Sequence, residues 1–170
     1  MANSTAAHAQ GALTIRPVNA ADDEAIASVI RSVMTEFGMS GEGYSSNDAE
    51  LDHMAEAYAG PRAAYFVLTD GARIVGGGGI AQLEGGAPDV CELKKMYFLP
   101  EARGAGMGRA MLTLCLDAAR ERGFTRCYLE TLSTMHDARR LYERAGFTQI
   151  PAPIGATGHF SCDAWYEQAL

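Results

Sequence analysis

The hexad "RGAGMG", residues 103–108, decides how the rest of this sequence is interpreted. It follows an apolar, strand-like run at residues 90–99 that Pro100 closes, and it precedes an amphipathic, helix-like run. Three glycines in such a turn allow bare backbone N–H groups to converge on a phosphate at the start of a helix. A turn whose glycines serve only the backbone geometry is the alternative, so the flanking sequence has to decide.

Two common phosphate-binding loops do not fit the hexad. A dinucleotide-binding fingerprint requires GxGxxG at the first helix of the fold, but here the third glycine is out of place and several expected strands come first. A Walker A loop requires Lys-Ser or Lys-Thr after its last glycine, whereas Arg109 and Ala110 follow Gly108. Both of these nucleotide sites are therefore rejected.

Apolar periodicity and turn residues predict one mixed α/β domain. Strands are expected at residues 13–16, 64–68, 73–82, 90–99, 124–132, 147–150 and 163–170, and helices at residues 23–37, 49–58, 107–122 and 137–144. The Asp70-Gly71 pair predicts a hairpin between antiparallel strands. The connection through the hexad should be a right-handed crossover between parallel strands, so the expected sheet is mixed.

Composition and charge exclude several classes of partner. A net charge of −7 argues against a general nucleic-acid or anionic-membrane surface, and no apolar run approaches the ~18 residues of a membrane span. The N-terminus lacks the basic start and apolar core of a secretory signal. The four cysteines form no CxxC pair, and the histidines show no metal-ligand spacing. We therefore expect a cytoplasmic protein with reduced, buried cysteines and no metal.

The segments around the hexad resemble one enzyme family. Arg103-x-x-Gly106-x-Gly108 is similar to the Arg/Gln-x-x-Gly-x-Gly/Ala motif of the GNAT superfamily of acyl-CoA-dependent N-acetyltransferases. "LKKMYFLPEA" before the hexad, "RRLYERAGF" at residues 139–147 and "CDAWYEQAL" near the end resemble further segments of that family. The resemblance covers nearly the whole chain from Leu13.

The resemblance implies the GNAT fold. This fold is a twisted, mixed and mostly antiparallel sheet of six to seven strands with about four helices, whose fourth and fifth strands splay apart. Residues 13–170 are then a single N-acetyltransferase domain, and residues 1–12 are expected to be a flexible tail. A homodimer is left open.

The resemblance also implies acetyl-CoA as the co-substrate. The hexad backbone would hold the pyrophosphate, two arginines would add positive charge, and the backbone of the preceding strand would hold the pantetheine arm. The implied cofactor-binding residues are Met96, Tyr97, Phe98, Arg103, Gly104, Ala105, Gly106, Met107, Gly108 and Arg109. One position departs from the family pattern, because Met135 stands where many relatives carry an asparagine that touches the cofactor.

Two residues are the candidates for catalysis. Glu92 lies 11 residues before Arg103, where histone-type relatives carry their catalytic base; the alternatives are that it pairs with Lys94 or faces solvent, and Glu130 is a second candidate base. Tyr142 matches the tyrosine that many relatives place beside the CoA sulfur, and a phenol can protonate a departing thiolate. The alternative for Tyr142 is a core aromatic that anchors its helix.

The acceptor is the least determined part of the prediction. Loops at residues 38–47 and 151–162 are expected to select it, with possible contacts from Glu42, Tyr44, His159 and Asp163. We expect direct attack on the thioester by a primary amine of a small molecule or amino acid. A protein or peptide amine is an alternative acceptor, and a CoA-binding sensor or interaction domain without catalysis is the alternative function.

Overall fold

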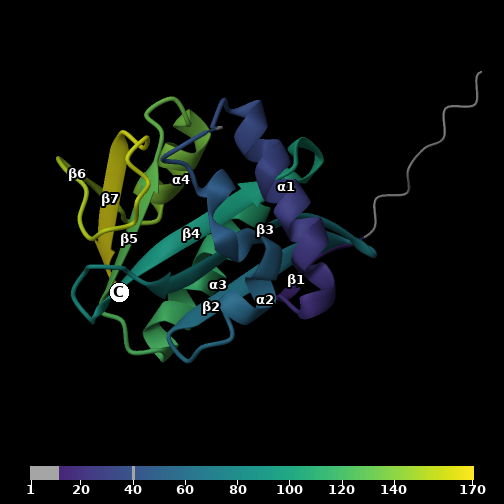
Figure 1. Cartoon of the computed structure of the whole chain (residues 1–170), viewed down its shortest axis with the longest axis horizontal. Coiled ribbons are helices and arrows are strands. Elements are labelled where there is room, and N and C mark those ends of the chain that lie inside the picture. The colour runs from purple at the N-terminus through teal and green to yellow at the C-terminus, as the bar shows by residue number, and fades with distance from the viewer. Residues whose placement is uncertain (1–11, 40) are drawn as a thin grey trace, which may run out of the picture.

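The computed structural model describes residues 12–39 and 41–170, so residues 1–11 of the expected tail lie outside the described part. One seven-stranded sheet runs through the molecule in the order β1-β2-β3-β4-β5-β7-β6 (Figure 1). The strands are β1 (Leu13–Pro17), β2 (Ala63–Asp70), β3 (Arg73–Gln82), β4 (Val90–Phe98), β5 (Arg126–Thr131), β6 (Thr148–Ile150) and β7 (Ala164–Ala169). All seven expected strands are therefore present.

Four α-helices accompany the sheet. They are α1 (Asp23–Glu36), α2 (Met54–Ala57), α3 (Met107–Glu121) and α4 (His136–Arg144), and the short 3-10 turns are η1 (Ala20–Asp22), η2 (Ser45–Asn47), η3 (Ala49–His53) and η4 (Pro100–Ala102). The helix expected at residues 49–58 is thus split into η3 and a single α-helical turn. Its N-cap residue, Asp48, makes no side-chain capping bond, because its carboxylate binds Lys95 and His159 instead.

The pairing of β4 with β5 creates the gap around which the site is built. This pair is parallel and extends only over Val90, Cys91 and Glu92 on β4, whereas every other strand pair is antiparallel. Beyond Glu92 the two strands separate, although β4 continues to Phe98 and β5 to Thr131. The expected splay of the fourth and fifth strands is confirmed.

Two apolar cores lie on opposite faces of the sheet. The larger one joins the buried side of α3 and Tyr142 of α4 to the strands. The other joins α1 and α2 to Tyr65 and Val67 of β2, so that α1 and α2 cover one face while α3 covers the other (Figure 1). All four cysteines are free; Cys162 is partly exposed, and the other three are buried as expected.

The run of four glycines in β3 is explained by close packing on both faces. A Cβ at Gly76 would lie 2.4 Å from the ring of Phe98, and one at Gly77 would lie 2.8 Å from the ring of Tyr65. Glycine in a strand interior weakens the strand unless another group approaches closely. Here two aromatic rings approach, and β3 thereby fixes the position of Phe98 at the end of β4.

Candidate active site

A cavity of about 380 Å³ lies beside the free end of β4, between α1 and α4. It brings together seven of the residues expected from the sequence: Met96, Tyr97, Phe98, Arg103, Gly104, Gly108 and Tyr142. Its remaining lining residues are Val33, Phe37, Ala102, Met135, Asp137, Ala138 and Leu141. Gly106 and Arg109 lie instead at a shallow depression over the outer side of α3, and Ala105 and Met107 line neither of these two hollows.

The glycine hexad contains two residues in the left-handed backbone conformation. Gly104 and Gly106 both have a φ of +78°, and a Cβ on either one would meet nothing within 4 Å. The backbone conformation therefore requires glycine, while packing within the chain does not. Gly106 is the N-cap of α3 and no side chain caps this helix, so its first N–H groups remain available to a phosphate.

Arg103 holds the end of β4 against α1. Its Nε donates to the carbonyl oxygen of Phe98 at 2.8 Å, and its guanidinium makes two 2.7 Å bonds to the carboxylate of Glu36. Glu36 neutralises Arg103, and the arginine thereby connects the end of β4 to α1. Its expected contribution of positive charge to the cofactor stays a prediction.

Tyr142 both packs in the core and reaches the cavity. Its ring lies 6.0 Å from that of Phe147 and 6.4 Å from that of Tyr166, and the residue is buried. No residue in the described part of the chain hydrogen-bonds to its hydroxyl, although the side chain lines the cavity. Burial raises the pKa of Tyr142 above its usual value, so the phenol is protonated at neutral pH.

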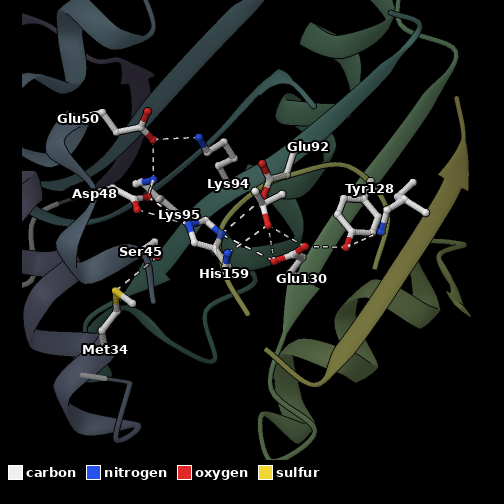
Figure 2. Close-up of polar contacts among 12 residues, drawn as sticks. Met34, Ser45, Asp48, Glu50, Glu92, Lys94, Lys95, Tyr128, Glu130 and His159 are labelled. Carbon is white, nitrogen blue, oxygen red and sulfur yellow. Dashed lines mark hydrogen bonds and ion pairs between the residues drawn. The ribbon is translucent and has the colours of Figure 1, made fainter. Parts of the chain in front are cut away.

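A cluster of charged groups lies on the other side of the splay, centred on His159 (Figure 2). The Nδ1 atom of His159 lies 3.9 Å from a Glu92 oxygen and 3.7 Å from a Glu130 oxygen, while its Nε2 lies 3.3 Å from Asp48. Glu130 also accepts bonds from the Tyr128 hydroxyl at 2.7 Å and from Thr157 at 3.0 Å. His159 and Glu130, which are distant from Glu92 in the sequence, thus lie beside it.

Burial makes Glu92 a weak acid suited to proton transfer near neutrality. Only 5% of the residue is exposed, and burial raises the pKa of its carboxyl to about 7, opposed by the charges of Lys94 and His159. The hydrogen bond to Asp48 raises the pKa of His159. Lys94 Nζ makes its ion pair with Glu50 at 3.0 Å, and its charge also acts on Glu92.

Lys95 marks a kink in β4 that the sequence did not indicate. Its φ is +51°, the one positive value for a residue other than glycine in the described chain, and the pairing of β3 with β4 shifts register at this point. Its ammonium, with a side chain 1% exposed, lies 2.5 Å from both Asp48 and Glu50. Such a bulge redirects a strand, and here it separates the charged stretch from the cavity-lining residues Met96–Phe98.

Two hollows adjoin the charged cluster. One, of about 40 Å³, is lined by Glu92, Glu130 and His159 together with Tyr97, which also lines the large cavity. The other is an open groove of about 260 Å³ over Glu130 and His159, bordered by Trp165. The two cavities on either side of β4 therefore meet at Tyr97.

The loop residues expected to contact an acceptor divide into two groups. His159 lines both acceptor-side hollows and Tyr44 lines the smaller one. Asp163 instead binds the backbone and hydroxyl of Ser133, and Glu42 lines neither hollow. Sequence reasoning missed Asp48, Glu50 and Lys95, for which neither spacing nor composition gives a signal.

The same cluster is the site where ligand atoms for a cation converge. Glu92, Glu130 and His159 each offer a ligand atom, and these atoms lie within 4.8 Å of one another, the one such group in the described residues. No metal-ligand spacing in the sequence predicts this group, because its members come from three separate elements. Two carboxylates and an imidazole this close together attract a cation.

A family model described as the acetyltransferase (GNAT) family matches residues 26–147. The chain belongs to the GNAT family. It is 44% identical over 150 residues to the uncharacterized N-acetyltransferase YjgM of Escherichia coli K12, covering 88% of this chain and 90% of YjgM. This GNAT protein is accordingly an acetyl-CoA-dependent N-acetyltransferase, and the resemblance found in the sequence is confirmed.

Solved structures agree on the fold. A GNAT acetyltransferase from Staphylococcus aureus Mu50 superposes with a TM-score of 0.78 at 20% identity, over 93% of this chain and 99% of the other. A phosphinothricin acetyltransferase from Sinorhizobium meliloti, solved in complex with acetyl-CoA, superposes with a TM-score of 0.72 at 20% identity, over 93% of this chain and 88% of the other. In the described part of this chain, no helix combines the length and apolarity needed to cross a membrane.

Proposed function

We propose that this N-acetyltransferase acetylates the primary amine of a small molecule by direct attack on the thioester of acetyl-CoA. One observation carries the proposal: the cavity beside the hexad and the cluster around Glu92 lie on the two sides of the splayed β4 and share Tyr97. A thioester entering from the first side and an amine entering from the second would meet there. The bound acetyl-CoA of the Sinorhizobium relative supports the cofactor.

The amine must lose its proton before or during the attack. At pH 7 the deprotonation of an alkylamine of pKa about 10.4 costs about 4.6 kcal/mol, so a base that accepts this proton speeds the reaction. Glu92, whose pKa burial raises to about 7, is matched to this task at neutral pH. It would take the proton directly or through a water molecule.

Bond changes then follow on the cofactor side. The amine nitrogen bonds to the thioester carbonyl carbon, and a backbone N–H of β4, at Phe98 or its neighbour, stabilises the oxyanion. When the oxyanion collapses, the carbon–sulfur bond breaks and the thiolate leaves. Tyr142 gives the thiolate its proton, and the phenolate that forms takes up the second proton that the nitrogen loses as the amide forms, so the products are the acetylated amine and CoA with a free thiol.

The proposal is tested by measuring thiol release from acetyl-CoA in the presence of amines, amino acids, polyamines and peptide N-termini, with mass spectrometry of the acceptor. We expect release that depends on a small amine and matches its acetylation mole for mole. Acetylation of proteins or peptides alone would contradict the small-molecule acceptor. CoA binding without turnover on any acceptor would favour a sensor domain.

A further inference from the structure

The cations beside Glu92 are already neutralised by carboxylates of the chain. Lys95 Nζ lies 2.5 Å from Asp48 and from Glu50, and Lys94 Nζ lies 3.0 Å from Glu50. Two lysines and two carboxylates therefore balance one another. No arginine lines either acceptor-side hollow among the described residues.

The remaining charges are those that an incoming acceptor meets. Glu92 and Glu130 both face His159 Nδ1, while Asp48 holds His159 Nε2. Asp48 is also the partner of Lys95, so a protonated His159 offsets only one of Glu92 and Glu130 and leaves the other carboxylate unpaired. The acceptor side has a surplus of negative charge, which attracts an ammonium group and repels a carboxylate.

The open groove next to this cluster has a different character. Pro153, Ala156, Phe160 and Trp165 border it, and its volume is about 260 Å³. Phe160 is 77% exposed, so one wall presents an uncovered aromatic ring. A body attached to the amine would lie against these apolar groups once the amine has reached Glu92 and Glu130.

We infer that the acceptor is a primary amine without a carboxylate on the amine-bearing carbon, and that its apolar or aromatic body occupies the groove at Trp165. This inference rests on the proposed function and names its substrate class. It excludes free α-amino acids as good acceptors, because their carboxylate would lie beside Glu92 and Glu130, while the two lysines that line the same hollow, Lys94 and Lys95, are already paired with Glu50 and Asp48. Like charges placed together in a binding site cost several kcal/mol.

Three compounds with the same aromatic body test the effect of the carboxylate charge separately from the effect of the body. Phenethylamine lacks the carboxylate, phenylalanine carries it, and phenylalaninamide carries it in neutral form. We expect kcat/KM for phenethylamine and for phenylalaninamide to exceed that for phenylalanine by about 100-fold or more. Phenethylamine also controls for the lower amine pKa of the amide. Equal or better use of phenylalanine would overturn the inference.

Binding is read independently of turnover. Trp165 is the one tryptophan of the chain, so intrinsic fluorescence of the protein loaded with CoA, which cannot react, reports occupancy of the groove. We expect phenethylamine to change this fluorescence at much lower concentration than phenylalanine. If it does so while no amine ever releases thiol from acetyl-CoA, the proposed function fails, and the inferred preference of the groove for amines without a carboxylate stands as a binding property. If none of the three compounds changes the fluorescence, the inference fails.

A matched pair of variants tests the origin of the preference. Glu130→Gln removes one negative charge but keeps an oxygen for the bonds from Tyr128 and Thr157. The control, Glu121→Gln, removes one negative charge from the exposed end of α3. We expect Glu130→Gln to reduce the ratio between phenethylamine and phenylalanine about tenfold, and Glu121→Gln to leave it unchanged. An unchanged ratio in Glu130→Gln, or equal changes in both variants, would contradict the inference.

Discussion

On one side of the splayed β4 the cavity is lined by backbone, glycines and apolar side chains, mostly from residues 96–108 and α4. On the other side His159, in the β6–β7 loop, meets the carboxylates of Asp48 at the start of η3, Glu92 of β4 and Glu130 of β5 (Figure 2). We propose that the first side holds the cofactor common to the family, largely through backbone. The second is built by tertiary contacts and is where this chain can differ from its relatives.

The largest effect is expected on the cofactor side, from a side chain introduced into the hexad. Gly106→Val should abolish measurable CoA binding, because Gly106 has a φ of +78° that valine rarely adopts and its neighbours would hold the pyrophosphate. Gly123→Val is the matched control: Gly123 has the same φ and equally open surroundings, but lies at the other end of α3. Calorimetric titration with CoA should show binding for Gly123→Val alone, and equal loss in both would implicate the fold.

A change at Tyr142 should affect turnover without affecting the cofactor. Tyr142→Phe removes only the hydroxyl, which has no partner among the described residues, and should lower kcat by roughly 10- to 1,000-fold. The affinity for acetyl-CoA should change little, because the ring still lines the cavity. Steady-state kinetics with thiol detection measures both quantities. Normal turnover would return Tyr142 to a purely structural role.

On the acceptor side, burial of the Glu92 carboxyl should make the stability of the protein depend on pH. The pKa of Glu92 is raised from 4.5 to about 7, so the folded state favours the protonated form. The stability that Glu92 contributes in this form is lost as pH rises from about 4.5 to 7. Glu92→Gln should therefore raise the free energy of unfolding by up to about 3 kcal/mol at pH 8 and by little at pH 4.5. Denaturant unfolding at both pH values measures this; equal effects would place Glu92 in contact with water.

The smallest effect is expected on the acceptor side, from removal of the charge of His159. The charge of His159 lowers the pKa of Glu92, so His159→Gln should move the acid limb of the kcat/KM profile to higher pH. At pH 7 this lowers kcat/KM about two- to fivefold. CoA affinity should stay the same, and His53→Gln, at an exposed histidine, should shift nothing. A limb that moves to lower pH would show that His159 does not act through its charge.

The two sides also differ in how far the sequence predicts them. Residues 103–108 and Tyr142 are recognisable because a local motif carries the chemistry, and the strands and helices follow from apolar periodicity with ends within a few residues of those observed. Glu92 and Glu130 were candidates from their strand positions. Asp48, Glu50 and Lys95 were not, because their pairing depends on the bulge at Lys95 and on the approach of η2 and η3 to β4.

The central claim is that Glu92 activates the amine while the other side of β4 holds the cofactor. The most direct test is the pH profile of kcat/KM for Glu92→Gln beside wild type and Glu121→Gln, with CoA affinity measured on the same samples. We predict a defect of about 100-fold near pH 7 that shrinks as rising pH deprotonates the amine, with unchanged CoA affinity. A defect that is small at every pH, or one that comes with lost CoA affinity, would contradict the claim.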